Sequence, residues 1–75
     1  MSDITNYENL ANAIILQAAK DYIHAIRTVK RRKNAEEPLR EALEIEAFFH
    51  APWYGMLTQV DPDYLIDRLR KEAVE

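Results

Sequence analysis

The side chains best suited to chemistry lie in the middle of the chain, where basic residues recur at helical spacing. Lys20, Arg27 and Arg31 fall within about 40° of one another on a helical wheel, because a helix turns by about 100° per residue. Residues 20–33 contain six bases and one acid, a net charge of +5, in a chain of formal net charge −3. Clustered Lys and Arg side chains bind phosphate groups. The pattern predicts an anion-binding face; the alternative is a solvated face, or one that pairs with acidic residues of another copy.

A second candidate is the aromatic segment AFFHAPWYG, residues 47–55, which holds four of the seven aromatic residues. We expect Phe49 and Trp53 to fill the core where the second helix turns onto the first. Phe48 and Tyr54 point elsewhere on the helical wheel, so one of them can serve as an exposed anchor. Exposed aromatic side chains mark interfaces and also stack on bases. The segment is therefore predicted to be a hydrophobic corner with a binding edge.

Glu46 is a carboxylate in the middle of the predicted apolar face of the second helix. A buried charge without a partner is costly, so a partner is expected. The candidates are His50 one turn further on, Trp53, or an arginine from another helix. The alternative is a functional role, as an acceptor for a ligand or as an acid–base group.

No catalytic or metal-binding motif is found. The chain has no cysteine, no Gly-rich phosphate loop, no HExxH sequence and no Ser/His/Asp set. Gly55 is the only glycine, and it would let a backbone, a ring or a ligand approach closely. His24 falls on the polar side of the first helix and is expected at the surface. We expect no catalytic residue, metal or cofactor; the candidate ligand-binding residues are Lys20, His24, Arg27, Arg31, Phe48, His50 and Tyr54.

The elements that must position these residues are helical. Thr5 and Asn34 each stand three residues before a glutamate, which is the capping-box pattern of a helix N-terminus. Pro52 is expected to end the second helix, because the residue before a proline avoids the helical region. Asp61 is a good N-cap, and Pro62 suits the first helical position. Helices are predicted at about residues 6–33, 35–50, 52–58 and 62–73.

The first helix is predicted to be about 40 Å long and unusually apolar. Its apolar residues cover roughly 240° of the circumference, whereas a helix resting on one neighbour needs a stripe of about 100°. The excess predicts burial on two sides, by the rest of the chain and by another copy, with Asn12 setting the register. The alternative is one central helix wrapped by the short helices of its own chain.

Length and composition indicate one small domain, residues 1–75, of the all-α class. Apolar content of 48% and 31% charged residues are typical of a folded protein, and one Gly with three Pro argues against a β-rich fold. A chain this short is marginal alone, so a homo-oligomer through the first helix is expected. Its longest apolar run is too short for a bilayer, and no secretory leader pattern is found. We expect a cytoplasmic location in a host cell and no membrane partner.

The chain resembles a group of short proteins encoded in prophages and mobile elements of Gram-positive bacteria. The resemblance lies in YENLANAIILQAAKDY, in E-x-E-x-FF and in W-Y-x-x-L-T-x-V-D-x-x-Y-L-I-x-x-L. A serine often stands in that group where this chain has Ala51. The resemblance implies phage biology, in which very small proteins without catalytic motifs act by binding. They block a host defence protein, sequester a signalling nucleotide or bind nucleic acid.

The expected function is that of a non-catalytic, phage-type accessory protein active in counter-defence. Oligomeric copies would place the basic face beside an aromatic side chain of the corner and sequester an anionic, nucleotide-like ligand. One alternative is a nucleic-acid-binding regulator, although the acidic second helix argues against a helix-turn-helix, since phosphates would repel it. Another alternative is an inhibitor that binds a host defence protein through its acidic surface.

Overall fold

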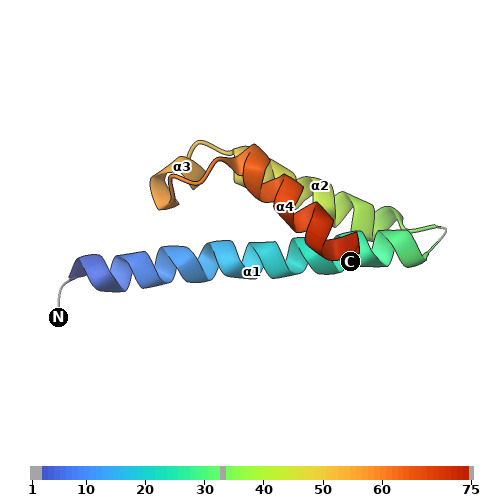
Figure 1. The fold of residues 1–75 in the computed structure, drawn as a ribbon, viewed down its shortest axis with the longest axis horizontal. Helices are drawn as coiled ribbons and strands as arrows, with labels where there is room; N and C mark the ends of the chain where they lie inside the picture. Colours follow the sequence, from blue (N-terminus) through green and yellow to red (C-terminus); the bar gives the residue numbers. More distant parts are fainter. Residues whose placement is uncertain (1–2, 33, 75) are drawn as a thin grey trace.

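The computed structural model describes the backbone of residues 3–32 and 34–74, and the side chains of these ranges from residue 12 onward. Four helices follow one another: α1 (Asp3–Arg31), α2 (Glu36–His50), α3 (Tyr54–Leu57) and α4 (Pro62–Val74). Within the described ranges there is no strand, and the predicted all-α bundle with one long N-terminal helix is confirmed. In Figure 1, α2 and α4 lie together over the second half of α1, and α3 lies over its first half.

The first helix begins three residues earlier than predicted and is helical only to Arg31. Thr5 is therefore inside α1, and its predicted role as N-cap is wrong. The sequence before Thr5 holds no Gly or Pro, and each added helical residue contributes one more backbone hydrogen bond. Arg32 is not helical, although its backbone N–H still bonds to the Thr28 carbonyl at 3.1 Å. The predicted end at Lys33 lies outside the described residues.

The second helix begins one residue later than predicted, because Pro38 has no backbone N–H. With Asn34 as N-cap, Pro38 would be the fourth helical residue, whose N–H must bond to the N-cap carbonyl. The structure instead has Ala35 as N-cap, without a side-chain capping bond, and Leu39 donates its N–H to the Ala35 carbonyl at 3.0 Å. The predicted capping box at Asn34 is therefore wrong.

The other two helix boundaries follow their local signals. Before Pro52, Ala51 is extended (φ −69°, ψ 148°) and ends α2, as predicted. The short helix is α3, shorter than the predicted 52–58. Asp61 caps α4 as predicted: its Oδ2 accepts the Tyr64 N–H at 3.1 Å, and Pro62 is the first helical residue.

The core is small and built around two aromatic rings. Tyr22 and Phe49 are fully buried and meet edge to face, with ring centroids 6.4 Å apart. Among the side chains that the structure describes, nine hydrophobic ones are buried, and four of these are alanines, which let the helix backbones approach closely. The buried residues are Ala19, Tyr22, Ala25, Ala42, Phe49, Tyr54, Ile66, Leu69 and Ala73.

Much of the predicted apolar surface stays exposed. On α1, Ile14 and Leu16 are exposed, so the wide apolar arc is not enclosed by the short helices of the same chain. On α2, Leu39 and Leu43 are also exposed. The exposure on α1 has a geometric reason: α1 has 29 residues, whereas α2 has 15 and α4 has 13, so these two helices are too short to cover α1 along its whole length.

Candidate anion-binding site

The predicted ligand-binding residues lie in two separate places. The basic members Lys20, His24, Arg27 and Arg31 are on the second half of α1, and all four are exposed. The other three, Phe48, His50 and Tyr54, lie where α2 turns into α3. Within one chain the structure does not bring the two groups into a common pocket. The candidate anion site is built from His24, Arg27 and Arg31 of the basic group, whereas Lys20 lines neither of its two clefts.

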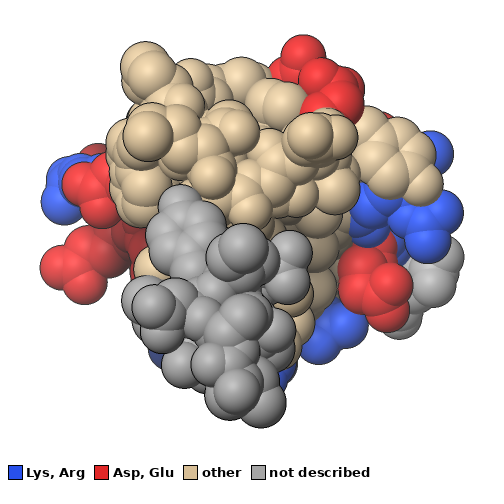
Figure 2. Space-filling model, turned by 90° about the vertical axis from the view of Figure 1, so that its left-hand side faces the viewer, with Lys and Arg blue, Asp and Glu red and all other residues tan. Residues whose placement is uncertain are grey.

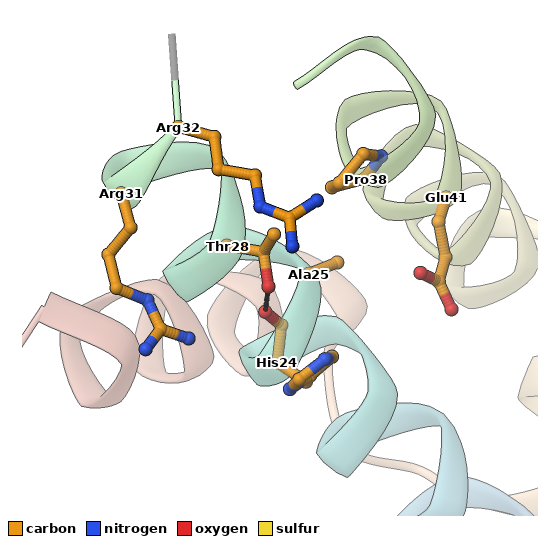
Figure 3. Close-up of a pocket in the computed structure, with 7 residues that line it drawn as sticks. All are labelled: His24, Ala25, Thr28, Arg31, Arg32, Pro38 and Glu41. Carbon is orange, nitrogen blue, oxygen red and sulfur yellow. Dashed lines mark hydrogen bonds between the residues drawn. The ribbon is translucent and has the colours of Figure 1, made fainter. Parts of the chain in front are cut away.

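A cleft of about 550 Å³ lies between the last turns of α1 and the first turns of α2 (Figure 3). In Figure 3 the Arg32 side chain extends from α1 toward Pro38 of α2. Thr28 Oγ1 donates to the His24 carbonyl oxygen at 2.9 Å, so the hydroxyl oxygen is still available as an acceptor. The lining residues are His24, Ala25, Thr28, Arg31, Arg32, Pro38 and Glu41.

A second cleft, of about 440 Å³, lies between α1 and the end of α4. His24 and Arg31 line both clefts and so form the ridge between them. The other basic residues that line the second cleft are Arg27 and Lys30, and the rest of its lining is the apolar pair Ala73 and Val74. No described acidic residue lines this second cleft. A ligand with two anionic groups could therefore contact both sides of the ridge.

The arginines of this region differ in what they already bind. Arg27 donates from Nε to the Ala73 carbonyl and from Nη2 to the Glu72 carbonyl, both at 3.3 Å. It therefore caps the C-terminus of α4, where a cation also complements the helix dipole. Neither the Arg31 side chain nor the Arg32 side chain has a hydrogen bond or ion pair within the described part of the chain. These two guanidinium groups are free to bind a ligand.

Acidic residues limit what the first cleft can accept. Glu41 lines it, and Glu36 and Glu37 are in the first turn of α2. Carboxylates there complement the positive end of the α2 dipole. They would also repel a long polyanion that ran past the cleft along α2. The charge distribution therefore favours a short anionic ligand over an extended nucleic acid.

The aromatic corner is packed differently from the prediction. Tyr54, the predicted edge residue, is only 2% exposed, whereas Trp53, the predicted core residue, is 46% exposed. Phe48 is partly buried and packs against Trp53, with ring centroids 4.5 Å apart. Gly55 is not needed for a close approach, since a methyl group there would meet no described atom within 4 Å. Tyr54 is therefore too buried to be the exposed anchor. Tyr54 and Gly55 nevertheless line a cleft of about 530 Å³ together with His50, so the binding edge at this corner stays a prediction.

Glu46 has structural partners on two other helices. Its Oε2 accepts the Tyr22 hydroxyl at 2.5 Å and the Arg70 Nη2 at 2.8 Å, and Arg70 Nε donates to the Tyr22 oxygen at 2.9 Å. Burial alone would raise the pKa of Glu46, but these two hydrogen bonds outweigh it and lower the pKa below its ordinary value. The predicted arginine from another helix is thus Arg70 of α4, and no functional role is needed to explain Glu46.

His50 is not the partner of the Glu46 carboxylate. Its Nδ1 lies 3.0 Å from the Glu46 carbonyl oxygen, and its Nε2 lies 2.7 Å from Asp63 Oδ1. Both ring nitrogens therefore face acceptors, which only a doubly protonated ring can satisfy. The hydrogen bond with Asp63 raises the pKa of His50 above its ordinary value.

This pair should make stability depend on pH. The pKa of His50 is raised in the folded state. The pair with Asp63 therefore contributes its full stabilisation below the unfolded-state pKa of about 6.5. This stabilisation is lost as the pH rises through the folded-state pKa of His50. We expect Asp63→Asn to lower the melting temperature more at pH 5.5 than at pH 8.5. Asp67→Asn is the control, since it removes an ion pair with a lysine, Lys71, instead of one with a histidine. Equal losses at both pH values for Asp63→Asn would contradict the assignment.

Sequence reasoning missed several residues of these sites. Arg32, Thr28 and Lys30 line the basic clefts but were not among the candidates. Arg32 belongs to the run of basic residues at the end of α1, and this position could have indicated a role in anion binding. On the helical wheel, however, its side chain points away from that of Arg31, which argued against such a role. Because the chain leaves the helix at Arg32, the wheel no longer predicts its direction. Arg70 gave no local signal, since its partner is 24 residues away.

Comparisons with protein-family models, with curated proteins and with solved structures found nothing that matches this chain. Among the described side chains, those of residues 12–32 and 34–74, no cluster of three or more His, Cys, Asp or Glu could hold a metal ion. In the same part of the chain, no helix combines the length and the apolar character needed to cross a lipid bilayer.

Proposed function

We propose that this protein is a non-catalytic binding protein that holds a short, phosphate-bearing anion, such as a nucleotide, at the ridge formed by His24 and Arg31. The observation that carries the proposal is that the side chains of Arg31 and Arg32 line a cleft of about 550 Å³ and have no partner among the described residues. A guanidinium group binds a phosphate through two parallel hydrogen bonds, which gives both charge and direction. The cleft is within the size range of small-molecule sites.

The neighbouring polar groups fit the same ligand. Thr28 offers its hydroxyl oxygen, and the exposed His24 ring can donate to a phosphate or to a sugar hydroxyl. On the other side of the ridge, Lys30 supplies a further cation. The proposal includes no chemical step, because these are groups that bind and neutralise an anion. In the phage context that the sequence resemblance implies, such binding would sequester a host signalling nucleotide and so counter host defence.

The test is the affinity of the purified protein for nucleotides, measured by isothermal titration calorimetry at low ionic strength. Hydrogen bonds to charged groups contribute about 1.5–3 kcal/mol each, so Arg32→Ala should weaken binding by about 10- to 100-fold. Arg68→Ala is the matched control, because Arg68 is also an exposed arginine without a described partner, but it lies on α4 outside both clefts.

Two results would contradict this function. The first is equal affinity of the wild-type protein and Arg32→Ala for every nucleotide that binds. The second is binding only to duplex DNA, with an affinity that falls steeply as salt is added. The second result would mean that the ligand is nucleic acid and not a nucleotide. The acidic residues of α2 argue against this alternative.

A further inference from the structure

Among the side chains that the structure describes, one acidic residue, Glu41, lines the clefts of the proposed anion site. It comes from α2, whereas the basic lining of both clefts comes from residues 24–32. In Figure 3 the Glu41 carboxylate lies on the α2 side of the first cleft, across from Thr28 and Arg32. This cleft therefore has cations on one side and a carboxylate on the other.

The opposite charges of this cleft do not meet. Glu41 has no hydrogen bond or ion pair with any described residue, and the same is true of the Arg31 and Arg32 side chains. The cleft of about 550 Å³ keeps the two sides apart. It therefore has room for a ligand that presents an anion to the arginines and hydrogen-bond donors to the carboxylate.

The usual structural roles of a glutamate on a helix do not account for Glu41. Glu36 and Glu37 are in the first turn of α2, where carboxylates complement the helix dipole. Glu41 lies beyond that turn. An ion pair along the helix surface would need a cation three or four residues away, and these positions hold no cation. They are occupied by Glu37, Pro38, Glu44 and Ile45.

Charge is not spread evenly over the molecule. Figure 2 shows the end at which α1 begins, and its described surface is broadly free of Lys, Arg, Asp and Glu, with charged residues at the margins. The two clefts lie toward the other end of α1. A ligand that needs both cations and a carboxylate therefore finds them at the clefts.

The chemistry of a carboxylate indicates which nucleobase it would bind. A carboxylate accepts hydrogen bonds and donates none, and its two oxygens can accept from two neighbouring donors. On the Watson–Crick edge of guanine, the N1–H and the N2 amino group are two adjacent donors. Adenine and cytosine present one donor beside an acceptor, and uracil presents one donor between two carbonyl oxygens. Guanine is therefore the base that matches a carboxylate best.

We propose that Glu41 is a specificity-determining residue and that the ligand of this cleft is a guanine nucleotide. Arg31 and Arg32 bind the phosphate, and Glu41 accepts the N1–H and the N2 amino group of the base on the other side of the cleft. The carboxylate also sets the direction of binding, because it repels phosphate from the α2 side. This inference rests on the proposed nucleotide site and adds the identity of the base to it.

The first test compares GDP, IDP and ADP by isothermal titration calorimetry of the purified protein at low ionic strength. IDP keeps the N1–H of GDP but lacks the N2 amino group, and ADP lacks both donors. We expect GDP to bind most tightly, with a loss of about 10-fold for IDP and a larger loss for ADP. Equal affinities for the three would overturn the selection of guanine but leave the anion site standing. No binding of any of them would overturn both proposals.

The second test changes the carboxylate without changing its size. Glu41→Gln should weaken GDP binding by about 10-fold and remove the preference over ADP, because an amide presents one donor and one acceptor and so suits adenine better. Glu44→Gln is the matched control and should keep the preference. Glu44 is also an exposed glutamate of α2 without a described partner, but it lies outside both clefts.

Arg31→Ala separates the phosphate from the base. It should weaken GDP and ADP by the same factor, because both carry the same phosphates, and so leave their ratio unchanged. Circular dichroism of each variant checks that the helices are retained. A Glu41→Gln variant that keeps the wild-type preference for GDP over ADP would overturn the role of Glu41, even if Arg31→Ala abolished binding.

Discussion

Phe49→Ala is expected to lower the free energy of unfolding by about 3–5 kcal/mol, the largest loss of any single substitution proposed here. The ring is fully buried and contacts Tyr22, Phe48 and Tyr54, so its removal leaves a cavity between three helices. A chain of this length has a total stability of about 4–11 kcal/mol. The loss is therefore a large fraction of the total, and the unfolding transition should move to clearly lower temperature and urea concentration, as measured by circular dichroism.

Trp53→Ala is the control for this prediction, because the sequence pattern assigned both rings to the core. Trp53 is 46% exposed and packs mainly against Phe48. Its loss should cost about 1 kcal/mol, the value of one aromatic pair. Comparable losses for Phe49→Ala and Trp53→Ala would show that the corner is packed differently from the structure.

Tyr22→Phe should lower the free energy of unfolding by about 1.5–3 kcal/mol, because the hydroxyl donates to a carboxylate and accepts from a guanidinium. Burial and the hydrogen bond to Glu46 both raise the pKa of Tyr22, so the hydroxyl stays protonated as the donor. Urea denaturation measures the loss directly. The ring remains in place, so the change isolates the polar contacts from the packing of the core.

The same substitution at Tyr54, which is also buried, should have the opposite effect on the free energy of unfolding. The Tyr54 hydroxyl is buried without a hydrogen-bond partner in the described part of the chain, which carries a desolvation cost. Tyr54→Phe should therefore be neutral or more stable by up to about 1 kcal/mol. A clear destabilisation would contradict this prediction, because it would mean that the hydroxyl has a hydrogen-bond partner outside the described residues.

The parts of the fold that local chemistry decides could be predicted from the sequence. Asp61 and Pro62 start α4, and Pro52 ends α2, because each acts on backbone groups within a few residues. The start of α2 was missed by one residue, although the missing N–H of Pro38 contained the necessary signal. The start of α1 was missed because helix continuation needs no special residue.

The candidate site could be predicted only in part. The regular spacing on α1 placed His24 and Arg31 correctly on one exposed face. After Pro52 the chain leaves the helix, so the helical wheel could not show that Tyr54 turns inward and Trp53 outward. The choice of Arg70 as the partner of Glu46 depends on how α4 crosses α2, which no local pattern contains.

The contacts of Tyr22, Glu46 and Arg70 also bear on cooperativity. The three residues span 48 positions of the chain and come from α1, α2 and α4. No two helices can satisfy all three side chains, so detachment of α4 alone would leave the Glu46 charge without its cation. Partly unfolded states that keep only the α1–α2 pair are therefore penalised. In a domain with so small a core, this polar junction favours the loss of all three helices in one transition over their separate fraying.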